Sequence, residues 1–204
     1  MARPKKSDDS KSSRELLLEA ATELIRTKGY SSTTVDDLCA RAGVSKGTFF
    51  HYFKSKEELA VASAHRWSEM TGEFFKNAPY HNKMDPLERL LGYIRFRRDI
   101  LQGEVPEFTC LVGTMVQEVY HSHPEIKEAC FESISSHAEK LEADIAEAKK
   151  LYAPKDKWTP RGLALHTQAV LQGAFILAKG SGEAKLAAES VDHLENYIRL
   201  LFKK

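Results

Sequence analysis

Apolar residues recur along this chain at the three- and four-residue spacing of an α-helix. The first clear run places Leu17, Ala20, Ala21, Leu24 and Ile25 on one helical face, and the same spacing returns throughout the sequence. No stretch alternates apolar and polar residues as a half-buried β-strand would. The pattern therefore predicts an all-α fold.

Small polar residues and glycines mark the helix boundaries. Thr34, Ser45 and Ser55 are residue types that cap helix N-termini, whereas Gly29 and Gly43 predict helix ends. Further helices are predicted over about 56–76, 85–103, 108–120, 124–152 and 160–179, with a last helix after Gly182. We therefore expect three short helices followed by a larger helical part.

Positive charge is concentrated locally, although the formal net charge of the chain is only +1. Residues 41–56 contain four Lys or Arg residues and no acidic residue, and the N-terminal arm is also rich in basic residues. Such bunching favours a local phosphate-binding surface over an even coating of charge.

The three cysteines, Cys39, Cys110 and Cys130, form no CxxC pair and leave an odd thiol. This argues against a disulfide framework and for a reducing compartment. The start of the sequence has no apolar signal segment, and no apolar run approaches the roughly 20 residues of a membrane-spanning helix. We therefore expect a cytoplasmic protein.

Residues 42–59, AGVSKGTFFHYFKSKEEL, follow the segment TTVDDLCAR. They predict the end of one helix, a tight turn at Gly43 and a second helix that begins at Ser45. This is the helix-turn-helix plan, in which the second helix enters the major groove of DNA. That helix lacks acidic residues, as a surface that meets phosphates must.

The segment resembles the TetR family of transcriptional regulators. The matching pattern runs from about Leu17 to Leu59 and includes Gly29-Tyr30, Thr33-Thr34-Val35, AGVS at 42–45 and KSKEEL at 54–59. Together with the polar arm, the resemblance implies a disordered basic arm (1–12), a three-helix helix-turn-helix DNA-binding domain (13–55) and a helical ligand-binding and dimerisation domain (56–204).

By position, the resemblance assigns phosphate contacts to the starts of the second and fourth helices, and base contacts to the start of the third. The predicted DNA-contacting residues are Thr34, Ser45, Lys46, Gly47, Thr48, His51, Tyr52 and Lys56. The chain departs from the family at Phe50, where many relatives have a tyrosine that reaches phosphate. Asp36, near the groove, is expected to point away or to pair with a base amine.

The part after residue 60 contains no catalytic motif such as G-x-S-x-G, H-E-x-x-H or a phosphate-binding loop. His121 and His123 could be a metal pair, but no third ligand stands at helical spacing, so a polar loop is the preferred interpretation. We expect neither an enzyme nor a metal or cofactor site.

The segment 160–179 is apolar on nearly every side, so it must be buried on every side. One face is expected to pack into the chain's own core, and the other against a second copy, with the last helix completing a four-helix interface. The predicted interface residues are Leu163, Val170, Leu171, Ala174, Leu177, Val191, Leu194 and Ile198.

Polar residues scattered on apolar helices predict a small-molecule cavity in the same part of the chain. The predicted lining residues are Trp67, Met70, Phe74, Ile94, Met115, Gln117, Phe131, Ile134, His137, Gln168 and Gln172. Each polar one is alternatively a satisfied core residue or a surface residue.

The leading hypothesis is a repressor that binds a palindromic operator as a homodimer and leaves it when a small molecule binds. The alternative is a DNA-binding regulator without a small-molecule inducer. Such a regulator would be controlled by a protein partner or by oxidation of a cysteine, Cys110 or Cys130.

Overall fold

The computed structural model describes residues 11–203, and every regular element in that range is a helix. In chain order the elements are α1 (Ser13–Lys28), α2 (Val35–Ala42), α3 (Lys46–Tyr52), α4 (Lys56–Lys76), the 3₁₀-helix η1 (Pro79–Asn82), α5 (Pro86–Asp99), α6 (Val105–Phe108), α7 (Leu111–Val119), α8 (Pro124–Tyr152), α9 (Pro160–Ser181) and α10 (Ala184–Leu201). The predicted all-α fold is confirmed. Most of the predicted disordered arm lies outside the described residues. None of the helices in the described range is long and apolar enough to cross a membrane.

The predicted starts and ends of the first helices are confirmed. The side-chain oxygens of Thr34, Ser45 and Ser55 each accept a hydrogen bond from the backbone N–H three residues later, at 3.0–3.1 Å. Gly29 and Gly43 both adopt a positive φ, which costs little only for glycine. Local sequence therefore determines these boundaries.

Two boundaries between residues 99 and 111 differ from the prediction. The helix expected to reach residue 103 ends at Asp99, and the helix expected over 108–120 begins later, as α7 at Leu111, after the separate short helix α6. The α7 helix begins anew after Cys110, whose Sγ accepts the Gly113 N–H at 3.4 Å. The pattern gave no sign of this start, because cysteine is not among the preferred capping residues.

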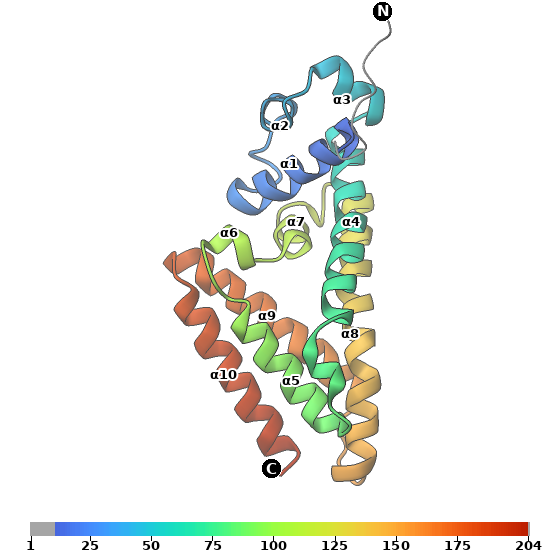
Figure 1. The fold of residues 1–204 in the computed structure, drawn as a ribbon, viewed down its shortest axis with the longest axis vertical. Coiled ribbons are helices and arrows are strands. Elements are labelled where there is room, and N and C mark those ends of the chain that lie inside the picture. The colour runs from blue at the N-terminus through green and yellow to red at the C-terminus, as the bar shows by residue number, and fades with distance from the viewer. Residues whose placement is uncertain (1–10, 204) are drawn as a thin grey trace, which may run out of the picture.

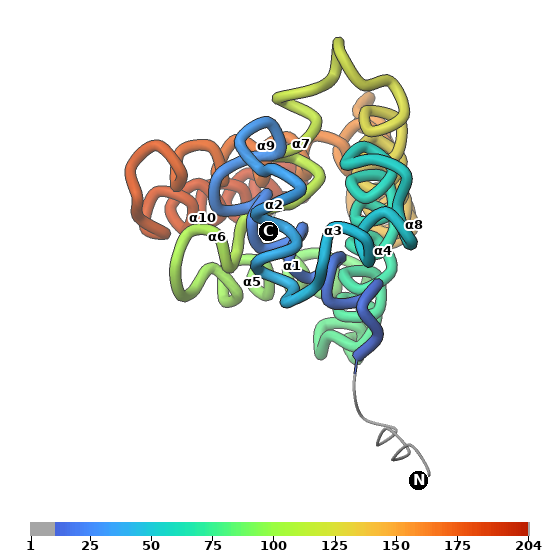
Figure 2. Tube along the Cα trace, turned by 90° about the horizontal axis from the view of Figure 1, so that it is seen from above, coloured from blue at the N-terminus to red at the C-terminus, as the bar shows by residue number. Residues whose placement is uncertain are grey.

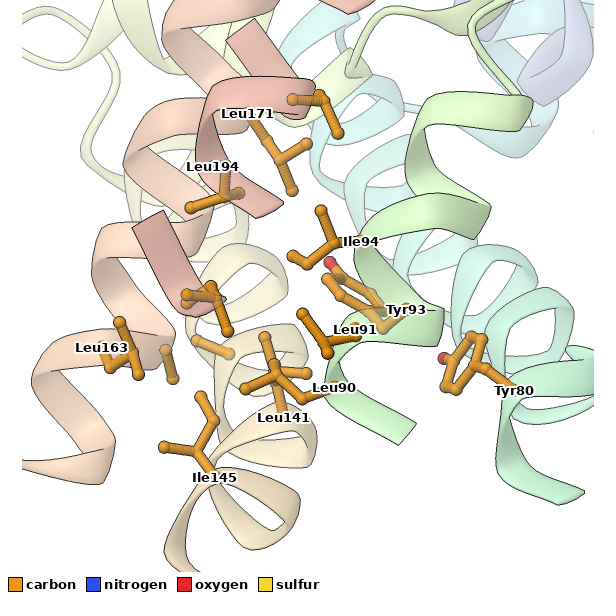
Figure 3. Close-up of a cluster of buried hydrophobic side chains, with 14 of the residues drawn as sticks. Tyr80, Leu90, Leu91, Tyr93, Ile94, Leu141, Ile145, Leu163, Leu171 and Leu194 are labelled. Carbon is orange, nitrogen blue, oxygen red and sulfur yellow. The ribbon is translucent and has the colours of Figure 1, made fainter. Parts of the chain in front are cut away.

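The buried side chains form two clusters, and the helices that carry the two clusters lie one above the other along the long axis of the molecule (Figure 1). The upper core joins α1, α2 and α3 to the first half of α4, to α7 and to the start of α8. The lower core joins η1, α5, α9 and α10 to the second half of α8, and Figure 3 shows part of it.

The α4 and α8 helices lie side by side and belong to both cores (Figures 1 and 2). On α4, Leu59 belongs to the upper core and Phe75 to the lower one; on α8, Ile126 and Ile145 are divided in the same way. Buried contacts therefore continue across the domain boundary predicted at residues 55 and 56, which stays a prediction.

Six of the eight predicted interface residues lie inside the chain's own lower core, at no more than 4% exposure. They are Leu163, Leu171, Ala174, Val191, Leu194 and Ile198. Figure 3 shows three of them directed toward α5 and α8 side chains. A side chain enclosed in this way cannot contact a second copy, so their assignment to the interface is wrong. Leu177 is 52% exposed and Val170 is half-buried.

Candidate DNA-binding surface and ligand cavity

The turn between α2 and α3 is closed by the backbone around Gly43. This residue has φ 66° and ψ 34°, and the N–H of Val44 donates to the Cys39 carbonyl at 3.0 Å. A Cβ is disfavoured in that left-handed conformation, so glycine allows α3 to leave α2 at this angle. Phe49 and Phe53, both nearly fully buried, anchor one face of α3 and leave the opposite face exposed.

The exposed face of α3 carries most of the predicted DNA-contacting residues. Ser45, Lys46, Gly47, His51 and Tyr52 are exposed, and Thr48 is half-buried. The hydroxyl oxygens of Ser45 and Thr48 lie 2.9 Å apart, and the rings of His51 and Tyr52 pack edge to face with centroids 4.8 Å apart. The predicted residues therefore form one continuous surface.

Asp36 pairs with Lys46, which neither expectation for this residue included. Its carboxylate lies 2.7 Å from the Lys46 ammonium, and this hydrogen bond raises the pKa of the ammonium. Both side chains are largely exposed, at 61% and 69%. Surface ion pairs contribute little to stability, so a DNA group can replace either partner at small cost.

Gly47 lies in the first turn of α3, and the fold itself does not require a glycine there. Its φ is not positive, and a Cβ added to it would meet nothing nearer than the Ser45 hydroxyl oxygen, at 3.6 Å. Glycine inside a helix costs roughly 0.5–1 kcal/mol relative to alanine. A glycine at such a position is typical of a backbone that another molecule approaches closely.

The ammonium of Lys56 is directed inward rather than toward the outer surface. It donates to the carbonyl oxygens of Tyr30 at 3.0 Å and Thr33 at 2.9 Å, and lies 4.1 Å from the centre of the Tyr30 ring. Burial lowers its pKa. This side chain holds the loop between α1 and α2 against the start of α4, and its phosphate contact stays a prediction.

Most other cations of this surface already have acidic partners at 2.5–2.8 Å. These pairs are Lys11–Glu19, Lys28–Asp37 and Arg41–Glu23. Within residues 11–203 the exposed Lys54 side chain has no such partner, and the Arg14 guanidinium lies 5.5 Å from the centre of the Phe53 ring. Thr34 is exposed at the start of α2. The positive charge without an acidic partner in this range thus lies near the C-terminal end of α3, at Lys54 and Arg14.

A cavity of about 340 Å³ lies where the upper and lower cores meet. Small-molecule sites commonly enclose about 300–1,000 Å³. Helices from both halves of the chain contribute to its wall. The predicted residues found in the wall are Trp67, Met70, Phe74, Ile134, His137, Gln168 and Gln172.

Four of the predicted lining residues lie elsewhere. Ile94 is fully buried in the lower core and Met115 in the upper core. Phe131 is 62% exposed, and the exposed Gln117 donates to the Gly113 carbonyl of its own helix at 2.7 Å. Spacing places a residue on a helix face, but it does not decide which face looks into a cavity.

A chain of hydrogen bonds runs beside the cavity. The Gln168 amide donates to the Tyr93 hydroxyl at 3.2 Å, and that hydroxyl lies 2.9 Å from Nε2 of His137. Burial, with a smaller effect from the nearby cations Arg97 and Lys140, lowers the pKa of His137 to about 3. His137 is therefore neutral at pH 7, and its Nε2 can accept a hydrogen bond from the Tyr93 hydroxyl.

The cavity wall also contains two arginines that sequence reasoning missed. Arg26 of α1 donates through Nε to the Thr109 carbonyl at 2.8 Å, and its guanidinium lies 4.9 Å from the centre of the Trp67 ring. Arg97 of α5 lies over two phenylalanine rings. It belongs to the run RFRR at 95–98, which in sequence is typical of a solvated face. Arg97 follows the buried Leu90 and Ile94 at helical spacing, and this spacing is the feature of the sequence that could have indicated an inward-facing side chain.

Several contacts connect the cavity wall to the helices that hold α3. Glu118, on α7, accepts hydrogen bonds from the backbone N–H groups of Tyr30 and Ser31, at 3.1 and 2.8 Å. The α4 helix begins at Lys56 and carries Trp67 into the wall, while α1 contributes Arg26. Three elements of the upper core, α1, α4 and α7, therefore contribute to the cavity wall and also adjoin the loop between α1 and α2.

The exposed α3 surface and its turn define a helix-turn-helix DNA-binding protein. Residues 17–62 match the model of the family described as "Bacterial regulatory proteins, tetR family". Transcriptional regulator AcuR of Cereibacter sphaeroides is 30% identical over 117 residues, which is 57% of this chain and 53% of AcuR. HTH-type transcriptional repressor DhaR of Mycobacterium sp. is 24% identical over 81% of this chain and 82% of its own.

Solved structures agree with these sequence matches. A TetR-family regulator from Cytophaga hutchinsonii has the same fold, with a TM-score of 0.79 at 19% identity over 98% of this chain and all of that one. The chain thus has the fold of the TetR-family transcriptional regulators, and its residues 17–62 match the model of that family. Such proteins are regulators and not enzymes, as the sequence predicted. The alignment with AcuR spans about half of that protein.

Proposed function

We propose that the chain is a repressor that binds a palindromic operator as a homodimer and leaves it when a small molecule occupies the cavity. The observation that carries this proposal is the cavity of about 340 Å³ whose wall includes residues of α1, α4 and α7. The α4 and α7 helices also hold the loop between α1 and α2 through Lys56 and Glu118, and α1 contacts α3. Repression is supported by the name of the similar protein DhaR, a transcriptional repressor.

An apolar surface on α9 and α10 supports the homodimer. Its large side chains are 37–77% exposed: Leu165, Ile176, Leu177, Leu186, Tyr197 and Leu200. On α9, a Cβ added at Gly173 or Gly180 would meet nothing within 4 Å, so another backbone could approach closely. Contiguous exposed apolar surface is typical of protein interfaces. We assign the four-helix isologous interface to this face, in place of the buried residues that the sequence suggested.

Charge substitutions on the two faces of α9 test this assignment. Leu177→Glu should give a folded monomer, and should weaken operator binding about 100-fold or more, because two half-sites can no longer be gripped together. Leu171→Glu, within the core, should unfold the chain. Light scattering and circular dichroism distinguish the outcomes, and a dimeric Leu177→Glu variant would contradict the assigned face.

Release would follow if the ligand packs better when α4 is tilted away from its DNA-bound position. A ligand shifts such an equilibrium only by its differential affinity for the two states, typically about 1–3 kcal/mol of coupling. By reciprocity, operator DNA must weaken binding of the same ligand by the same factor. Trp67, which connects α4 to Arg26 across the wall, is the residue we expect to transmit the change.

The decisive experiment first selects DNA fragments with the purified full-length protein, and then tests metabolites for release. Trp67→Ala should alter the response to a releasing compound while leaving ligand-free operator affinity nearly unchanged. If the variant responds as the wild type does, Trp67 serves only in packing. If no compound releases the DNA and the cavity binds none, control by ligand is wrong.

A second candidate, control by thiol oxidation, is favoured by the position of Cys110. This half-buried residue lines the cavity at the start of α7. Negative charge on its sulfur would act on two nearby cations, Arg26 and Lys179. An electropositive, partly accessible helix start is the setting of reactive cysteines. Burial, by contrast, raises the pKa of the Cys130 thiol to about 12.

Hydrogen peroxide tests this second candidate. The Cys110 thiolate would attack one peroxide oxygen, forming sulfenic acid and releasing hydroxide. Peroxide should then weaken operator binding by the wild type and by Cys130→Ser, but not by Cys110→Ser. Equal sensitivity of all three proteins would remove Cys110 from this role.

A further inference from the structure

The α5 helix carries three arginines close together in the chain, and within the described part of the chain only one of them lacks an acidic partner. Arg95 lies 3.1 Å from Glu195, and Arg98 lies 2.5 Å from Asp192, both on α10. Arg97 has no ion pair or hydrogen bond from its side chain among the described residues. It faces the cavity instead of α10.

The surroundings of Arg97 orient its guanidinium without neutralising it. The guanidinium carbon lies 5.0 Å from the centre of the Phe75 ring and 5.6 Å from that of Phe175. Aromatic faces attract a cation, but they accept none of the directed hydrogen bonds that the five guanidinium N–H groups can make. The side chain is half-buried, so its donors are only partly available to solvent.

The remaining charges of the wall do not compensate Arg97. Glu107, the only acidic residue of the cavity wall within residues 11–203, is close enough to act on Arg26, and it also accepts the Glu104 N–H at 2.8 Å. His137 is neutral at pH 7, since burial lowers its pKa to about 3. The wall therefore presents one unmatched positive charge.

We propose that the cavity binds a small monocarboxylate whose carboxylate pairs with Arg97 and whose apolar body lies against Trp67 and Phe74. The planar guanidinium fork matches a carboxylate with two parallel hydrogen bonds. One unmatched charge fits a monoanion better than a phosphate dianion. The Gln172 amide, also in the wall and without a hydrogen-bond partner in residues 11–203, is available to a polar group on the body.

This inference rests on the proposed function, because it names the class of ligand that would occupy the same cavity. The probes are matched pairs that share one apolar body: benzoate with benzamide, 3-phenylpropanoate with 3-phenylpropanamide, and hexanoate with hexanamide. Calorimetry and thermal unfolding on the full-length protein measure binding. At least one carboxylate should bind, at least tenfold more tightly than its amide.

Variants on α5 then isolate the arginine. Arg97→Met keeps an apolar stem over the two rings and should weaken the carboxylate roughly 10- to 100-fold, as expected for a lost hydrogen-bonded charge, with little effect on the amide. Arg98→Met, the matched control, should bind as the wild type does. Arg97→Lys should fall between them. If Arg97→Met does not fold, Arg97→Lys and the carboxylate-to-amide ratio decide the question.

Three results would overturn the proposal: no carboxylate binding up to 10 mM, amides binding as tightly as their carboxylates, or unchanged carboxylate affinity in Arg97→Met. Operator release is measured separately. A carboxylate that binds at Arg97 without releasing the operator contradicts ligand-controlled repression alone. Release by neutral compounds and not by carboxylates contradicts the ligand class alone.

Discussion

The cations of the DNA-binding surface and those of the cavity are satisfied in opposite ways. On the surface, Lys28, Arg41 and Lys46 each hold an acidic partner at 2.5–2.8 Å in solvent. At the cavity, Arg97 is half-buried on two aromatic rings and holds no acidic partner in the described range. The three surface cations are therefore already paired with acids, whereas Arg97 at the cavity has no acidic partner among the described residues.

The difference follows from the dielectric of each environment. An exposed ion pair is weak because water screens it, so a phosphate or base edge can exchange with the acid at little cost. A partly buried charge is costly to leave unpaired, so an unpaired guanidinium there indicates that a partner comes from outside the chain. On the DNA-binding surface, a DNA group would replace the acidic partner of a cation. In the cavity, a ligand would supply a partner that Arg97 does not have within the described residues.

Substitutions in the Asp36–Lys46 ion pair should have the largest effect on DNA binding, and they test whether DNA replaces one partner of this pair. Lys46→Ala should weaken operator binding up to about 100-fold and change sequence preference, as expected for a lost base contact. Asp36→Asn should strengthen binding to all DNA by removing a competitor and a negative charge. Binding titrations on operator and random DNA measure both. Equal loss on the two DNAs for Lys46→Ala would remove this residue from base readout.

Two neighbouring lysines allow a matched comparison of an inward and an outward cation. Lys56→Met should lower the free energy of unfolding by about 2 kcal/mol, because its two hydrogen bonds to backbone carbonyls are lost. Lys54→Met should leave stability unchanged and reduce the salt slope of DNA binding by about one. Urea unfolding and salt titrations measure these effects. The reverse pattern would support the predicted phosphate contact of Lys56.

The neutral His137 beside the cavity makes stability depend on pH. Its folded pKa of about 3 lies below the ordinary value of 6.5, so the unfolded chain binds more protons between these values, and stability falls as the pH drops below about 6.5. We expect about 1 kcal/mol less stability at pH 5.5 than at pH 7 from this group.

His137→Gln should remove that part of the pH dependence, whereas His65→Gln, an exposed residue of α4, should not. The charged groups that act on His137 are Arg97 and Lys140. Urea unfolding at several pH values makes the measurement. An unchanged pH profile in His137→Gln would mean that the imidazole is not held neutral by burial.

Gly47→Ala has the smallest expected effect on the fold. Because a Cβ fits there without a clash, the variant should gain up to about 1 kcal/mol of stability from helix propensity. It should nevertheless bind the operator more weakly, since the added methyl group stands on the surface that meets DNA. Unchanged operator affinity in a stabilised variant would show that DNA does not approach this backbone.

Sequence alone determined the helix-turn-helix unit, because its signals are local. The capping oxygens of Thr34 and Ser45 act on backbone groups three residues away, and the glycine turn at Gly43 depends on its own φ. Such interactions are complete within a short stretch of chain. They can therefore be read before any tertiary contact is known.

Only the tertiary structure decided which face of each longer helix is buried, which is exposed and which lines the cavity. The apolar surface all round α9 predicted burial on every side, yet packing turned Leu171 into the core and left Leu177 exposed. Tertiary packing also placed Met115 in the upper core and brought Arg97 to the cavity. It likewise directed the Lys56 ammonium to the Tyr30 and Thr33 carbonyls. The rotation of a helix about its own axis depends on the residues that pack against it, and these are far away in the sequence. The periodicity along a single helix contains no information about them.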